Sequence, residues 1–148
     1  MAGLFATILN WLTPDVIVEV SRDIVAFHCQ GRIENIEPVL WITGEGRQRR
    51  MIAVGSNPAL TQPAERIQLF AADWNGRSDH ERLALLAVFW RYGLLRIIGR
   101  KLFIRPEVLV RDRRTVPTLE KDDLRVTITR ALEMAGAHEV TWGGHADV

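Results

Sequence analysis

The chain has 148 residues, of which 47% are hydrophobic and 25% charged, with 19 basic and 18 acidic side chains. This composition excludes a mostly disordered chain, and the length fits one domain. The single cysteine, Cys29, excludes an intramolecular disulfide framework and the usual thiolate zinc site, and it favours a reducing, cytoplasmic setting. The net charge of +1 gives no overall attraction to nucleic acid or membrane.

The first twelve residues contain no charged side chain. On a helix, their polar positions share one side, and the opposite side is formed by Leu4, Phe5, Ile8, Leu9, Trp11 and Leu12. We therefore expect an N-terminal amphipathic helix over residues 1–13 and a single domain over residues 14–148. The helix is too short to span a bilayer, which needs about 20 apolar residues. Contact with a membrane or partner and packing against the chain's own domain both fit this pattern.

Short β-branched runs predict strands at residues 16–20, 24–28, 39–43 and 50–54, with a tight hairpin between the first two. Residues 56–77 contain prolines, an asparagine and a glycine that disfavour regular structure. We expect this stretch to be mostly loop, with a short helical piece near residues 61–66.

Ser78 and Glu81 form a capping box, which predicts a helix over residues 79–99 that is buried on most sides. A strand is expected over residues 107–111. Thr118 resembles an N-cap for a helix that ends before Gly136, and a last strand is expected over residues 139–142. An antiparallel meander followed by alternating helices and strands predicts an α/β fold, in which helices pack on a mixed sheet of about five strands.

The charges are distributed unevenly along the chain. Residues 91–114 contain eight basic side chains against Glu107 and Asp112, a local net charge of +6. One interpretation is a solvated surface beside a buried strand. The other is a site for an anionic surface, with the candidate residues Arg100, Lys101, Arg105, Arg113 and Arg114.

Four stretches resemble one protein family in their order and spacing: Asn35–Leu40, Met51–Gly55, Ile104–Val110 and Ala131–Val140. They are similar to segments of MreB, the rod shape-determining actin homologue of bacteria. The resemblance implies a ribonuclease H-like core, as in one subdomain of the actin-like ATPases. It covers only the first structural half of such a protein, so we expect the second phosphate loop and the adenosine pocket to be missing from these residues.

The first phosphate loop of the family is also altered. The family motif Asp-Leu-Gly-Thr corresponds to Glu19-Val20-Ser21-Arg22, so the glycine is replaced by Ser21 and the threonine by Arg22. Only Glu19 keeps a carboxylate that could help to hold a metal. Two further motifs linked to the nucleotide are replaced at residues 111–114 and 144–146. The resemblance thus implies a degenerate phosphate loop with no catalytic residue, no cofactor and no ATP hydrolysis.

The sequence therefore favours a non-catalytic, MreB-like interaction module in a bacterial cell-shape or cytoskeletal context. Its expected partner is a protein: an actin-like filament, the shape machinery or a second copy of the chain. The alternative is a membrane-surface adaptor, peripheral at the inner membrane, that is anchored by the N-terminal helix and the block at 91–114. No nucleic-acid partner is expected, because the basic block lacks interleaved aromatics and a reading motif. The four histidines show no metal-ligand spacing.

Overall fold

The computed structural model describes residues 15–71, 76–99, 105–113 and 122–143. The larger of its two sheets has five strands in the order β3-β2-β1-β7-β8. The strands β1, β2 and β3 are antiparallel neighbours, whereas β7 and β8 run parallel to β1. The five strands are β1 (Asp15–Val20), β2 (Val25–Cys29), β3 (Arg32–Ile36), β7 (Glu107–Asp112) and β8 (Glu139–Trp142).

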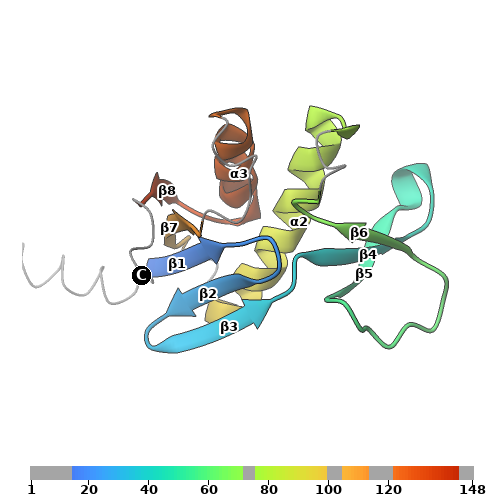
Figure 1. Ribbon diagram of the computed structural model, residues 1–148, viewed down its shortest axis with the longest axis horizontal. Helices are drawn as coiled ribbons and strands as arrows, with labels where there is room; N and C mark the ends of the chain where they lie inside the picture. Colours follow the sequence, from blue (N-terminus) through green and yellow to red (C-terminus); the bar gives the residue numbers. More distant parts are fainter. Residues whose placement is uncertain (1–14, 72–75, 100–104, 114–121, 144–148) are drawn as a thin grey trace, which may run out of the picture.

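A second, smaller sheet is inserted between β3 and the first described helix (Figure 1). It has the order β5-β4-β6, and both pairs are antiparallel. Its strands are β4 (Val39–Thr43), β5 (Arg50–Val54) and β6 (Glu65–Gln68). A short 3-10 helix, η1 (Gly46–Gln48), lies in the connection between β4 and β5.

The described helices, α2 (Asp79–Ile98) and α3 (Asp122–Ala135), pack against each other and lie on the same face of the five-stranded sheet (Figure 1). Helix α2 begins where the capping box predicts, because the Ser78 side chain accepts a hydrogen bond from the backbone N–H of Glu81. It ends at Gly99, whose φ of 57° is accessible to glycine without strain.

The core between the helices and the large sheet is centred on three aromatic rings. Phe27 of β2 lies 6.3 Å from Phe89 and 6.0 Å from Trp90, measured between ring centroids, and all three residues are fully buried. Gly93, one turn after Phe89 on α2, provides the space for the Phe27 ring. Helix α3 is joined to β8 by a hydrogen bond from Trp142 Nε1 to Thr129 Oγ1, at 2.9 Å.

The predicted α/β class with a mixed five-stranded sheet is confirmed, but the strands that form this sheet differ from those expected. Residues 39–43 and 50–54 are strands, as predicted, yet they belong to the second sheet. The expected helical piece near residues 61–66 is wrong, because β6 begins at Glu65. The sequence analysis does not predict strands β3 and β6. Each lies at a sheet edge and buries only one side chain among polar neighbours, Ile36 in β3 and Ile67 in β6.

Candidate functional site

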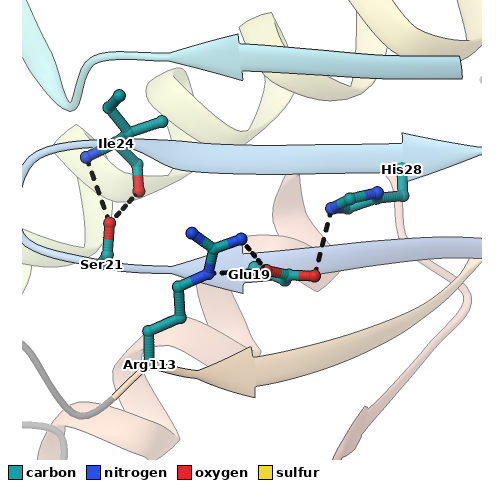
Figure 2. A network of polar contacts seen from close by, with 5 residues as sticks. All are labelled: Glu19, Ser21, Ile24, His28 and Arg113. Atoms are coloured by element: carbon teal, nitrogen blue, oxygen red, sulfur yellow. Dashed lines mark hydrogen bonds and ion pairs between the residues drawn. The ribbon is translucent and has the colours of Figure 1, made fainter. Parts of the chain in front are cut away.

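The candidate site is the hairpin between β1 and β2, where the family resemblance places a phosphate loop. The strands pair as far as Val20 and Val25, which leaves residues 21–24 as the loop. Ser21 is almost completely buried, and its hydroxyl accepts a hydrogen bond from the backbone N–H of Ile24 at 3.2 Å. The same hydroxyl donates to the carbonyl oxygen of Ile24 (Figure 2). The serine side chain therefore closes the loop on itself.

The Glu19 carboxylate lies on the sheet face opposite the helices and is already engaged by two side chains (Figure 2). The guanidinium of Arg113 donates from Nε to Glu19 Oε2 at 2.6 Å, and its Nη2 donates to the same oxygen. His28 Nε2 lies 3.2 Å from Oε1. This contact is an ion pair only with a protonated imidazole.

The parallel pairing of β1 with β7 brings Arg113 to Glu19. Glu19 is in register with Arg111 and Val20 with Asp112, and the backbone N–H of Arg113 donates to the carbonyl of Val20 at 3.1 Å. Since side chains alternate along a strand, Arg113 lies on the Glu19 face and Asp112 on the opposite, buried face.

The carboxylates at the ends of the neighbouring strands β1 and β7, Glu19 and Asp112, therefore point to opposite sides of the sheet and cannot converge on one metal ion. Consistently, the residues that the structure describes contain no group of three histidine, cysteine or acidic side chains with the geometry to bind a metal. Arg22, which the resemblance aligns with the threonine of the family's phosphate loop, is exposed at the hairpin tip.

The two anionic-surface candidates that the structure describes, Arg105 and Arg113, lie beyond opposite ends of β7. Arg105 precedes β7 and Arg113 follows it, so about 26 Å of extended chain separates them. Arg105 donates from Nη2 to the carbonyl of Ala137 at 3.3 Å, whereas Arg113 binds Glu19. The other candidates, Arg100, Lys101 and Arg114, and the membrane-contact candidates Leu4, Phe5, Ile8, Leu9, Trp11 and Leu12 lie outside the described residues.

Sequence reasoning identified Glu19 and Ser21 but not their partners. The sequence analysis places Arg113 on a basic surface and treats His28 only as one of four histidines without metal-ligand spacing. Only the register between β1 and β7 shows that Arg113 lies beside Glu19, and a single sequence does not reveal that register. His28 does alternate with the buried Phe27, which could have placed it on the polar face of β2.

Comparison with models of known protein families finds no match, and comparison with curated proteins finds none either. Within the described part of the chain, no helix is both long enough and apolar enough to cross a membrane.

Proposed function

We propose that the chain is a non-catalytic interaction module with a ribonuclease H-like core related to MreB. The order of the large sheet supports this proposal. Its antiparallel meander, β1 to β3, is followed by two parallel strands on the other side of β1, and helices α2 and α3 precede β7 and β8 respectively. This is the arrangement expected of a ribonuclease H-like core, and the smaller sheet is an insertion after β3.

The proposed absence of catalysis depends on one observation: the polar groups of the hairpin that could bind a metal or a phosphate are already bonded within the protein. A metal–nucleotide site here would need a free carboxylate and free backbone N–H groups facing the phosphates. The Glu19 carboxylate is neutralised by Arg113, and the N–H of Ile24 is taken by Ser21. Because these groups satisfy one another, phosphate binding would first require breaking a charge-assisted pair.

Titration of the purified chain with a fluorescent ATP analogue in the presence of Mg²⁺ tests this part of the proposal. We expect no saturable binding tighter than about 1 mM, whereas micromolar binding would overturn it. Arg113→Ala is the matched variant, because it removes the guanidinium from the Glu19 carboxylate and leaves the hairpin sequence unchanged. Nucleotide binding that appears only in this variant would support occlusion by Arg113.

The interaction itself is tested by co-sedimentation with polymerised MreB, and self-association by analytical ultracentrifugation of the chain alone. We expect either saturable co-pelleting or a concentration-dependent oligomer. A chain that stays in the supernatant with filaments present, and that is monomeric at all concentrations tested, would contradict an interaction role through filaments or self-association.

A further inference from the structure

The face of the large sheet opposite α2 and α3 carries three rows of side chains that run across the strands, since residues in register share a face. We call this surface the open face. The first row is acidic and consists of Asp15, Glu107 and Glu139. The middle row is largely apolar and consists of Ile33, His28, Ile17, Leu109 and Thr141. The third row consists of Asn35, Ala26, Glu19 and Arg111.

The middle row of the open face contains three apolar side chains, Ile17, Ile33 and Leu109, none of which is fully buried. Parallel strands are normally covered on both faces, yet among the residues that the structure describes no helix covers β1, β7 and β8 on this side (Figure 1). Ile33 is 58% exposed. A hollow of about 270 Å³ lies at the start of β1, and its lining includes Asp15, Ile17 and Ile33. No helix of the described residues therefore covers the middle row.

We propose that residues 1–13 of the same chain pack as an amphipathic helix on the open face, with their apolar side against its middle row. The described structure begins at Asp15, and this residue itself lines the hollow. Only Thr13 and Pro14 separate Leu12 from Asp15, so the Cα atoms of these two residues are at most about 11 Å apart. The last apolar residues of the segment, Trp11 and Leu12, are thus tethered beside the hollow.

The dimensions of the segment and the sheet agree. A helix of twelve residues is about 18 Å long. Five strands span four gaps of about 4.8 Å, or about 19 Å in total. A tether of two residues also gives the segment an effective concentration of at least millimolar order at its own sheet, which favours this contact over one with a second copy.

Charge favours the chain's own sheet over an anionic membrane as the occupant of the segment's apolar side. The polar side of the segment, formed by Gly3, Thr7 and Asn10, has no basic residue to bind lipid headgroups. The acidic row of the open face borders the point where the segment joins β1, so an anionic surface would be repelled there. A helix without charge meets no such penalty.

Hydrogen–deuterium exchange of the full chain tests the proposal, because an isolated helix of this length is marginal in water and its amides exchange quickly. We expect the amides of residues 2–12 to exchange at least about tenfold more slowly in the unaltered chain than in Ile33→Asp. The matched control is Met134→Asp, which alters a side chain that is 61% exposed on α3, away from the open face. It should leave the protection unchanged.

The other occupants are separate outcomes of the same experiment. Protection that rises with protein concentration would assign the segment to a second copy. Protection that arises only with vesicles of phosphatidylcholine and phosphatidylglycerol would assign it to a membrane. Fast exchange in the unaltered chain, or equal losses in Ile33→Asp and Met134→Asp, would likewise overturn the proposal. All these results are independent of ATP binding and of filament co-sedimentation.

A second measurement locates the segment directly. A spin label attached through Thr7→Cys, on the polar side of the segment and in a Cys29→Ala background, should broaden the methyl signals of Ile17 and Ile33 more than that of Met134. Equal broadening at the two places would contradict the assignment to the open face.

Discussion

Replacing Gly93 by alanine should destabilise the fold, although alanine is the better helix former. A Cβ atom built at Gly93 lies 2.1 Å from Phe27 Cζ and 2.5 Å from both Cε atoms. Ordinary contacts between carbon atoms are about 3.5–4.0 Å, so ring and helix must separate by roughly 1.5 Å. The Phe27 ring cannot simply rotate away, because it is fully buried against Phe89 and Trp90.

Two opposing terms set the magnitude. Alanine gains about 1 kcal/mol over glycine in a helix interior. Overpacking of a well-packed core typically costs about 1–3 kcal/mol, and this contact belongs at or above the upper end because three aromatic rings must shift together. We therefore expect Gly93→Ala to lower the free energy of unfolding by about 2 kcal/mol, which corresponds to a decrease in Tm of about 4–8 °C for a domain of this size.

Thermal and urea denaturation measure the effect. Ala84→Gly, at an exposed position on the same helix, measures the propensity term alone and should cost about 1 kcal/mol. Phe27→Leu shortens the clashing side chain, so Gly93→Ala should cost markedly less in that background. The reasoning fails if Gly93→Ala is as stable as the unaltered chain, or if its cost is the same with Leu at position 27.

Three further substitutions test contacts elsewhere in the molecule by the same denaturation assays. Trp142→Phe removes the hydrogen bond to Thr129 and should cost about 1 kcal/mol; an unchanged stability would mean that this bond contributes nothing. Ser78→Ala removes the acceptor for the Glu81 amide and should also cost about 1 kcal/mol, with faster amide exchange confined to the first turn of α2. Arg113→Ala should cost less than about 1 kcal/mol, because the guanidinium is half-exposed and screened; a larger loss would indicate that the pair with Glu19 is structural rather than occluding.

The elements predicted best are those with a strong hydrophobic pattern and a local start signal. Helix α2 follows its capping box and buries a broad apolar face. Strands β1, β2 and β7 follow their β-branched runs: β1 and β7 bury alternate valines, and β2 buries Val25 and Phe27. The misplaced and missed parts depend on pairing. Nothing local in Val39–Thr43 shows that it leaves the first sheet, and the polar sequence of Arg32–Ile36 does not indicate a strand until it pairs with β2.

The candidate site divides in the same way. The sequence shows Glu19, Ser21 and Arg22 at the positions that the resemblance aligns with a phosphate loop. The structure adds that Arg113, 94 positions away, holds that carboxylate, and that Asp112 faces the other side of the sheet. A single residue of register shift between β1 and β7 would exchange these two roles, because alternate residues of a strand face opposite sides.

The sequence by itself determined the α/β class, the main helices, the tight hairpin at residues 21–24 and the absence of charge in the first twelve residues. Those features depend on composition and on periodicities within a few residues, which a chain carries before it folds. The tertiary structure decided which strands share a sheet, which charges meet across it, and that its apolar middle row lies on a face without a described helix. Each of these depends on contacts between distant residues, whose register is set by the packing of the whole core.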